Sequence, residues 1–287
     1  MISKRIRSEQ TGNKNMKAEE FFNIFLDELK QNDKLKGYYR FLNDPKLFEF
    51  RKAYFLQRLK YIERQISDTS KKVFDIGCGY GTTGIFLALN GFEVYGNTLE
   101  FYYDQIQNRL IFWNQYGSTE SFTFSYENLF DSPPPEKSVD YIIVQDVLHH
   151  LEPLDTAINI IYTTLKPGGK LIACEENGLN LMNRTRLFMK RGNKRIIKIY
   201  DDKLEKEILL GNENIRSLTQ WEKELSKYNL EIDKKETEYI RYFFPGKYKS
   251  KNMQDIRQSE QHIWKKSKIK RDYFFHGINF TAVRKKQ

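Results

Sequence analysis

Short apolar runs alternate with longer amphipathic segments along residues 71–284. The short runs predict strands, and the longer segments, whose apolar residues recur three and four positions apart, predict helices. Strands are therefore expected at 72–76, 92–96, 121–126, 139–145, 170–175, 230–244 and 273–284. This alternation predicts an α/β fold with a mostly parallel, doubly wound sheet and right-handed crossovers. Ligands of such sheets bind outside the carboxyl ends of the strands.

A helical pattern also fills residues 19–66. Apolar residues recur there on one face, aromatic side chains are dense, and Asn43, Asp44 and Pro45 interrupt the pattern. Residues 1–17 are expected to be disordered. The chain is accordingly divided into an N-terminal disordered and helical cap, 1–66, and a larger domain, 67–287.

Two further segments interrupt the alternation. Residues 178–212 form an insertion for which two helices, 179–190 and 200–210, are expected. Residues 245–271 are basic and polar, and they predict a loop with a short helix. Between them, residues 217–228 predict a helix whose Trp221 and Leu225 point inward.

A strand, a glycine-rich turn and a helix follow one another in residues 72–90. Gly77, Gly79 and Gly81 let the turn adopt positive φ angles and let a ligand approach the backbone. The start of the helix offers free N–H groups to an electron-rich ligand group. Gly79, Gly81 and Gly84 also fit the pattern of nicotinamide binding. Asp75 argues against that class, because its carboxylate would repel a pyrophosphate and attract a cation.

Polar side chains occur where several predicted strands end. The carboxyl ends of parallel strands meet at one edge of a sheet, so these side chains are expected to line a common site. They are Asp75, Thr98, Glu127, Asp146 and Glu175.

Three stretches resemble class I S-adenosylmethionine-dependent methyltransferases. DIGCGYG resembles the first motif of that family, and VDYIIVQDVLHHLEPL and TTLKPGGKLIACEENG resemble its fourth and fifth strand regions. The resemblance covers about residues 71–180. It implies a seven-stranded Rossmann-like sheet whose last strand runs antiparallel between strands five and six. It also implies S-adenosylmethionine as cofactor, S-adenosylhomocysteine as product and direct displacement at the methyl group.

The resemblance places cofactor contacts along the strand ends. Asp75 is expected to bind the ammonium group of the cofactor. The remaining expected contacts are Gly77, Gly79, Gly81, Thr98, Glu100, Glu127, Asn128 and Asp146. The family usually has an acid after strand two that binds both ribose hydroxyls, and VYGNTLE places Thr98 there, with Glu100 two residues later. A neutral replacement gives up a charge-assisted hydrogen bond worth about 1.5 kcal/mol.

The acceptor side of the expected site holds a histidine pair. His149 and His150 are candidate catalytic bases, because imidazole can accept a proton near neutral pH. The alternative is that they cap and pack the following helix. Glu175 and Asn177 are candidate substrate ligands. The insertion 178–212 is interpreted as an acceptor lid.

Local signatures exclude some acceptor classes. The position after strand four reads QDVL, which disfavours amino-methylation of nucleic acid bases, and no Pro-Cys pair supports cytosine C5 methylation. No metal-ligand spacing of Cys, His and carboxylates appears, so no metal is expected. The prediction is methylation of a small or amphiphilic acceptor, with O-methylation favoured. A catalytically inactive methyltransferase-fold binding protein stays open as an alternative.

The net charge of +10 is unevenly distributed. Residues 71–180 contain 6 Lys and Arg against 14 Asp and Glu, a net charge of −8, whereas 1–70 and 181–287 carry +5 and +13. Basic flanks suit an acidic substrate, a nucleic acid or an anionic membrane face, and they are also typical of a solvated surface. A second alternative is therefore an RNA methyltransferase that uses the basic C-terminal region, and peripheral membrane contact also stays open.

The cysteines and the N-terminus indicate the compartment. Cys78 and Cys174 cannot make a disulfide framework, and residues 1–20 lack the apolar segment of a secretory signal. No run of 18 apolar residues occurs. A reduced, cytoplasmic setting is expected.

Overall fold

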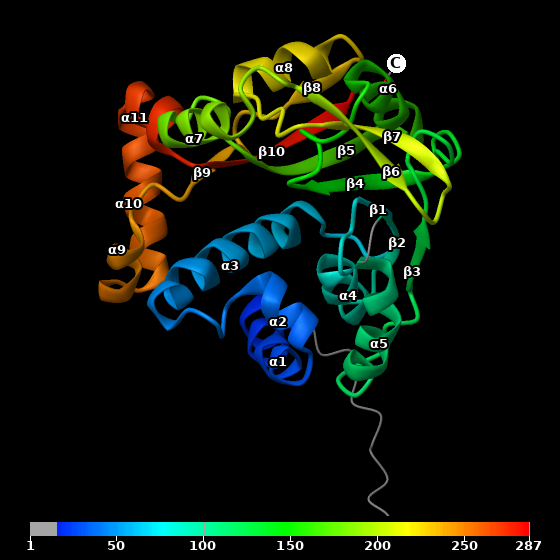
Figure 1. The fold of residues 1–287 in the computed structure, drawn as a ribbon, viewed down its shortest axis with the longest axis horizontal. Helices are drawn as coiled ribbons and strands as arrows, with labels where there is room; N and C mark the ends of the chain where they lie inside the picture. Colours follow the sequence, from blue (N-terminus) through cyan, green and yellow to red (C-terminus); the bar gives the residue numbers. More distant parts are fainter. Residues whose placement is uncertain (1–15, 100–101, 287) are drawn as a thin grey trace, which may run out of the picture.

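A computed structural model describes residues 16–99 and 102–286 (Figure 1). Its main sheet has eight strands in the order β3-β2-β1-β4-β5-β10-β8, with β9 also paired to β10. The parallel part consists of β1 (Lys72–Ile76), β2 (Glu93–Thr98), β3 (Phe122–Tyr126), β4 (Val139–Gln145) and β5 (Leu165–Glu176). The predicted α/β fold with a mostly parallel sheet is confirmed.

The other end of the sheet is antiparallel. β10 (Gly277–Arg284) runs antiparallel to β5 on one side and to β8 (Leu230–Ile232) and β9 (Glu238–Ile240) on the other. This confirms the expected insertion of the last strand. The single strand expected at 230–244 is wrong, because a turn interrupts it: the Asp233 carboxylate accepts a hydrogen bond from Lys235 N, and Glu236 N donates to Asp233 O.

Helices cover both faces of the sheet (Figure 1). One face packs on α4 (Thr82–Leu89), α5 (Tyr103–Trp113) and the N-terminal helices. The other face packs on α6 (Leu154–Thr164) and α8 (Leu218–Ser226), where Trp221 and Leu225 are buried as predicted. Side chains alternate between the faces of a strand, so Asp75, like Val73, is directed to the face of the N-terminal helices.

The N-terminal segment is helical, as its periodicity predicts. It forms α1 (Ala18–Gln31), α2 (Asp33–Tyr39), the short 3₁₀ helix η1 (Pro45–Leu47) and α3 (Phe48–Gln65). Phe21 of α1 stacks on Trp113 of α5 with ring centroids 4.3 Å apart. The expectation of disorder at 1–17 falls mainly outside the described residues, and Met16 is buried.

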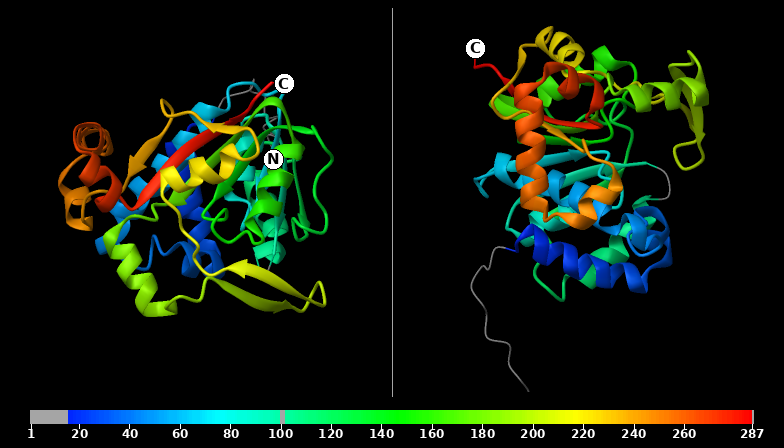
Figure 2. Two further views of the ribbon diagram at one scale, coloured as in Figure 1. Left: turned by 90° about the horizontal axis from the view of Figure 1, so that it is seen from above. Right: turned by 90° about the vertical axis from the view of Figure 1, so that its left-hand side faces the viewer.

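The insertion after β5 differs from the prediction of two helices. Its first half is helical, α7 (Leu181–Arg191), but β6 (Ile196–Asp201) and β7 (Lys206–Gly211) pair as an antiparallel hairpin. The helix expected at 200–210 is therefore wrong. The Asp201 carboxylate accepts hydrogen bonds from Lys203 N and Leu204 N and so fixes the turn. The hairpin projects from the body of the molecule (Figure 2).

The C-terminal basic stretch is more ordered than the expected loop. It contains α9 (Pro245–Ser250), α10 (Met253–Lys266) and α11 (Lys268–Phe274). Side chains of Asn252 and Ser267 cap α10 and α11 by accepting hydrogen bonds from Asp255 N and Lys270 N. Among the described helices, none is long and apolar enough to cross a membrane.

Candidate active site

The glycine turn between β1 and α4 leaves open space next to Gly79. Gly77, Gly79 and Gly81 all have positive φ angles, between +54° and +72°. A Cβ atom at Gly77 would lie 2.7 Å from Val147 Cγ2, and one at Gly81 would lie 2.7 Å from Phe122 Cε1, so both glycines are packed. A Cβ atom at Gly79 would meet no described atom within 4 Å. A ligand can therefore reach the backbone at Gly79.

The end of β2 supports this turn. Asn97 Oδ1 accepts a hydrogen bond from Gly77 N at 3.1 Å, and Asn97 O accepts one from Cys78 N at 2.9 Å. Thr98, at the place where the family usually has an acid, is buried, and its hydroxyl lies 3.4 Å from Leu99 O. Glu100 lies outside the described residues. Asn97 thus positions the turn, a role that the sequence alone did not predict.

Asp75 is a buried carboxylate within β1. Its side chain is 1% exposed, and within the described part of the chain its Oδ2 has no hydrogen-bond partner. Burial raises the pKa of Asp75 to about 7. An unpaired buried carboxylate is unfavourable, so this position is suited to a cationic group of a ligand.

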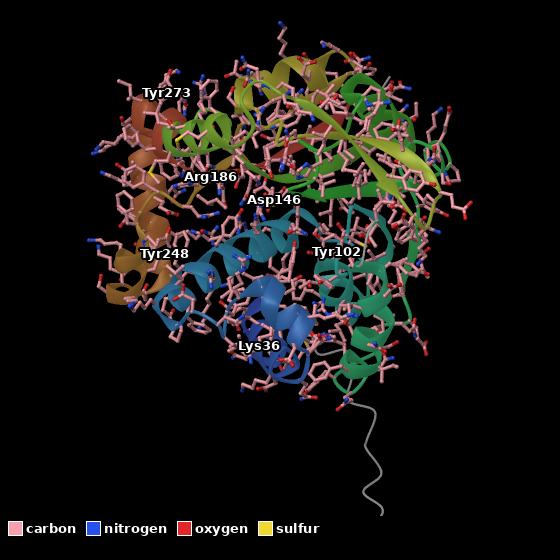
Figure 3. The ribbon with its side chains drawn as sticks, viewed as in Figure 1. Lys36, Tyr102, Asp146, Arg186, Tyr248 and Tyr273 are labelled. Atoms are coloured by element: carbon pink, nitrogen blue, oxygen red, sulfur yellow. The ribbon has the colours of Figure 1, made fainter. Side chains whose placement is uncertain are left out.

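Asp146 follows β4 in a left-handed conformation, with φ +53°. Both terminal nitrogens of Arg58, on α3, donate to its carboxylate, and Arg58 Nη2 also donates to Cys174 O at 3.0 Å. Burial alone would raise the pKa of Asp146, but the charge and hydrogen bonds of Arg58 outweigh burial and lower it. Figure 3 shows Asp146 between the sheet and α3. The N-terminal helices are thereby fixed to the strand ends.

Aromatic and basic groups line the neighbouring surface of α3. The Tyr54 ring lies between two guanidinium groups, with Arg58 Cζ 4.4 Å and Arg241 Cζ 4.1 Å from its centroid. Arg241 also lies 5.0 Å from the centroid of Phe50. Arg58 and Arg241 were not predicted, because no local pattern relates α3 to residues that are far away in the sequence.

Aromatic side chains of α2 lie over the glycine turn. Tyr38 packs edge-on against Tyr80 and Tyr102, with centroids 5.0 and 5.7 Å away. The Tyr39 hydroxyl is 2.6 Å from Thr82 Oγ1, at the start of α4. Half of the Tyr38 surface is exposed, so this residue borders solvent beside the turn.

The predicted catalytic histidines follow β4 and are held through their Nδ1 atoms. His149 is 3% exposed, and its Nδ1 bonds to Glu175 Oε2. His150 Nδ1 lies 2.8 Å from Gly211 O. Burial alone would lower the pKa of His149, but the Glu175 carboxylate outweighs burial and raises it to about 9.

Both predicted substrate ligands are engaged inside the protein. Glu175 is 1% exposed, and its Oε1 accepts hydrogen bonds from Val147 N and Leu148 N. Asn177 is also 1% exposed; its Nδ2 donates to Asp272 O and Phe275 O, and its Oδ1 accepts from Leu179 N. In the described structure these side chains bind protein partners, and their expected role as substrate ligands stays a prediction. Glu175 positions His149, and Asn177 joins the end of β5 to α11.

The predicted adenine contacts lie at the end of β3. Glu127 Oε2 accepts a hydrogen bond from the Tyr95 hydroxyl at 2.9 Å, and Asn128 Oδ1 accepts one from Phe130 N at 3.2 Å. Both residues are half-buried. They remain available as predicted cofactor contacts.

The structure also brings together a group of donors that the sequence did not reveal. One donor atom each of His149, His150 and Glu213 lie within 4.8 Å of one another. The spacing in the sequence did not reveal this group, and the expectation that no metal is bound stays a prediction. Glu213 follows β7, far from the histidines in the sequence. The spacing between Glu213 and the histidines therefore matches no metal-binding sequence motif.

A cavity of about 230 Å³ lies elsewhere, at the antiparallel end of the sheet. Tyr239 and Trp264 line it, together with Lys268, Arg271 and Asp272. The Asp272 carboxylate forms ion pairs with both of these basic residues. We assign the candidate site to the strand ends instead, because the unpaired carboxylate and the open glycine are found there.

Comparison with known proteins identifies the family. Residues 74–173 match the sequence profile of the family described as "Methyltransferase domain". Residues 74–173 therefore form a methyltransferase domain. The methyltransferase domain includes β1, β4, the glycine turn and the histidine pair, so the resemblance read from the sequence motifs is confirmed.

Curated relatives match the methyltransferase domain over part of their length. Sterol methyltransferase-like 2 of Botryococcus braunii is 31% identical over 133 residues, which is 45% of this chain and 33% of that protein. Ubiquinone biosynthesis O-methyltransferase of Coxiella burnetii is 28% identical over 116 residues, or 40% of this chain and 47% of that protein. This chain therefore spans less than half the length of either relative in the match.

The fold resembles a solved methyltransferase. Phosphoethanolamine N-methyltransferase 2 of Haemonchus contortus, in complex with S-adenosyl-L-methionine, superposes with a TM-score of 0.53 at 19% identity. The match covers 80% of this chain and 52% of that chain. At this identity the resemblance establishes the fold of the methyltransferase domain.

Proposed function

We propose that the protein transfers the methyl group of S-adenosylmethionine to a small or amphiphilic acceptor, and that the methylated atom is an oxygen. The observation that carries this proposal is the unpaired, buried Asp75 carboxylate next to the open backbone of Gly79. A carboxylate and an open glycine turn fit the aminoacyl group of S-adenosylmethionine, which carries an ammonium group. The family of the domain agrees with this assignment.

The residues of the chain then have separate roles. Asp75 binds the ammonium group, and the Gly79 backbone leaves room for the cofactor. Asn97 and Thr98 lie where the ribose hydroxyls are expected, and Glu127 and Asn128 lie where the adenine is expected. Bound S-adenosylmethionine supplies an electrophilic methyl group on its sulfonium. The protein's task is to place the acceptor in line with that group and to exclude water.

The acceptor is expected between the strand ends and α3. Asp146, Arg58 and Tyr54 lie in this region, and α2 and α3 border it. O-methylation is supported by His150 of the histidine pair after β4, because a hydroxyl acceptor must lose a proton during transfer. His149 already holds its proton against Glu175. O-methylation is also supported by the relationship to a protein named as a ubiquinone biosynthesis O-methyltransferase.

A calorimetric titration with S-adenosylmethionine and S-adenosylhomocysteine tests the proposal. We expect wild-type protein to bind both ligands, and Asp75→Asn to lose most of the affinity for each. Asp202→Asn, an exposed residue in the β6–β7 turn, is the matched control and should bind like wild type. Lack of binding to either ligand by folded wild-type protein would contradict the proposal and favour a non-catalytic role.

We propose that an amphiphilic acceptor comes from a membrane surface. Residues 181–195 contain six Lys and Arg and no Asp or Glu. Exposed apolar side chains are interspersed with these charges: Leu181 is 48% exposed, Met182 53%, Phe188 63% and Met189 76%. Basic charge with exposed apolar side chains is typical of a helix that lies on an anionic bilayer. Binding of RNA phosphates would require the charges but not the apolar side chains.

A further inference from the structure

Three potential metal ligands meet where the insertion returns to the main body. His149 and His150 follow β4, and Glu213 follows β7. One donor atom from each lies within 4.8 Å of the others, and His149 Nε2 is 3.7 Å from Glu213 Oε2. Ligands bound tetrahedrally to zinc at about 2.1 Å are about 3.4 Å apart. Small side-chain rotations would therefore bring this group to metal-binding distances.

Both imidazole rings are oriented by groups behind them. The Glu175 carboxylate binds His149 Nδ1, and Val147 N and Leu148 N hold the other oxygen of Glu175 in place. The Gly211 carbonyl accepts a hydrogen bond from His150 Nδ1. A ring that keeps only its Nδ1 proton has its lone pair on Nε2, so metal binding here must release the proton held on Nε2. Metal-ligating histidines typically have such a carboxylate or carbonyl partner, which fixes the tautomer and the ring orientation.

The third ligand is also on a fixed segment. Gly211 N donates to His150 O at 2.8 Å, and Asn214 N donates to His149 O at 3.2 Å. The backbone approach is so close that a Cβ atom at Gly211 would lie 2.3 Å from His149 O. Glu213, between these two contacts, adopts φ +57°. The carboxylate is therefore carried by a segment that is joined to the histidine segment on both sides.

We propose that His149, His150 and Glu213 bind a divalent transition-metal ion such as zinc. Two imidazole nitrogens and one carboxylate oxygen are a donor set that such ions accept, and three protein ligands leave a coordination position open. The inference rests on the proposed function in one respect: the open position is the place for the acceptor oxygen. Coordination lowers the pKa of a hydroxyl. The hydroxyl proton then passes to solvent, the O–CH3 bond forms and the S–CH3 bond breaks.

Metal binding can be measured without cofactor or acceptor. Metal-free protein would be titrated with Zn²⁺ by calorimetry and with Co²⁺ by visible absorption, which reports the coordination geometry. We expect one ion per chain with both metals. His150→Asn and Glu213→Gln should each weaken metal binding by at least about tenfold. Loss of a group that only hydrogen-bonds to a metal ligand already weakens metal binding about tenfold, and loss of the ligand itself should cost more. Zn²⁺ should also raise the unfolding temperature of wild type but not of these variants.

Matched controls separate this site from ordinary surface binding. His262→Asn and Glu205→Gln change an exposed histidine on α10 and an exposed glutamate in the β6–β7 turn. Both controls should bind metal like wild type. The metal site would be overturned if wild-type protein did not bind the metal ions, or if His150→Asn and Glu213→Gln bound them as tightly as wild type.

The same variants distinguish this inference from the proposed function. His150→Asn and Glu213→Gln should still bind S-adenosylmethionine, because Asp75 and the glycine turn are unchanged, and cofactor binding shows that they are folded. Loss of methyl transfer with cofactor binding retained would agree with a metal role. Cofactor binding without any metal binding would end the metal proposal and leave the methyltransferase proposal intact.

Discussion

Asp75 lowers the stability of the ligand-free protein, because its carboxyl group is buried. Its pKa is raised from 3.8 to about 7 because it is buried. A shift of this size corresponds to about 4 kcal/mol between the two protonation states. The folded protein holds the proton more tightly than the unfolded chain does, so the free energy of unfolding falls as the pH rises from about 4 to about 7. A bound ammonium group would stabilise the ionised carboxylate and so restore the free energy of unfolding that is lost near pH 7.

The first prediction concerns the pH dependence of Asp75. Affinity for S-adenosylmethionine should rise about tenfold per pH unit up to about pH 7 and then level off, because the ammonium group binds the ionised carboxylate. Asp75→Asn should remove this dependence. Without ligand, Asp75→Asn should be more stable than wild type at pH 8, by up to about 4 kcal/mol. Calorimetry and urea denaturation at pH 5 to 8 would measure both effects, and a flat wild-type profile would contradict the assignment.

The second prediction concerns Arg58, whose side chain is 11% exposed, whereas that of its partner Asp146 is 42% exposed. Because solvent screens Asp146, Arg58→Ala should reduce the free energy of unfolding by only about 1–3 kcal/mol. Arg58→Ala should also lower the rate of methyl transfer by more than this loss of stability explains, since the ion pair fixes α3 against the strand ends. Arg51→Ala, on the same helix, should change neither quantity appreciably. Equal loss of stability and activity in both variants would contradict this role.

Single residues were predictable only where they lie in local motifs. Asp75 and the glycines are part of one continuous stretch, and the physical requirements of that stretch are visible in the sequence. Arg58 and Glu213 reach the site from other segments. Their roles depend on long-range packing, and no spacing in one sequence encodes it. For Asn177, its position after β5 does not reveal that backbone carbonyls accept the hydrogen bonds of its amide.

Among the elements, α1 and α5 are joined by a buried polar network. Arg109 donates to both carboxylate oxygens of Glu28 at 2.8 and 2.7 Å, and Trp113 Nε1 donates to Glu28 at 2.9 Å. Arg109 also donates to Tyr80 O and Thr82 Oγ1, at the glycine turn. The N-terminal helices are thus connected to the cofactor side of the site.

The third prediction tests this network. Glu28→Gln should reduce the free energy of unfolding by about 3–5 kcal/mol, because it leaves the buried Arg109 charge without its partner. Asp27→Asn, on the exposed side of the same helix, removes an ion pair with Lys30 and should cost less than about 1 kcal/mol. Urea denaturation measures both. Similar losses in the two variants would show that burial of the pair is unimportant.

The elements with a strong local pattern were predicted correctly, and the errors have identifiable causes. Strands β1 to β5 are apolar runs with clear boundaries, and α1, α3 and α8 have regular apolar faces. Residues 200–210 were misread because Tyr200, Leu204 and Ile208 are spaced four apart, as in a helix, although a turn separates the two strands. The helices at 245–274 have few buried apolar residues, so their periodicity is weak.

At the scale of the whole molecule, residues 181–195 combine six Lys and Arg and no acid with four exposed apolar side chains. The fourth prediction is that the protein sediments with vesicles of anionic phospholipid but not with neutral vesicles, and that high salt weakens this binding. The double change Phe188→Ser and Met189→Ser should reduce binding strongly. Phe244→Ser and Ile269→Ser, exposed apolar residues outside the insertion, are matched controls. Salt-sensitive binding to RNA that persists in the Phe188/Met189 variant would favour the RNA alternative instead.

The insertion leaves the sheet after β5 and returns before α8. Residues 181–213 hold the exposed basic helix at one end and Glu213 at the other, whereas Asp75, the glycine turn and Asn97 lie wholly in the sheet core. Under the proposed function, the insertion expected to meet a membrane and the residues expected to bind the cofactor are therefore different parts of the chain. Replacing the insertion by that of a related protein should change the acceptor and leave the affinity for the cofactor unchanged. Acceptor specificity could then evolve, or be engineered, through this one segment.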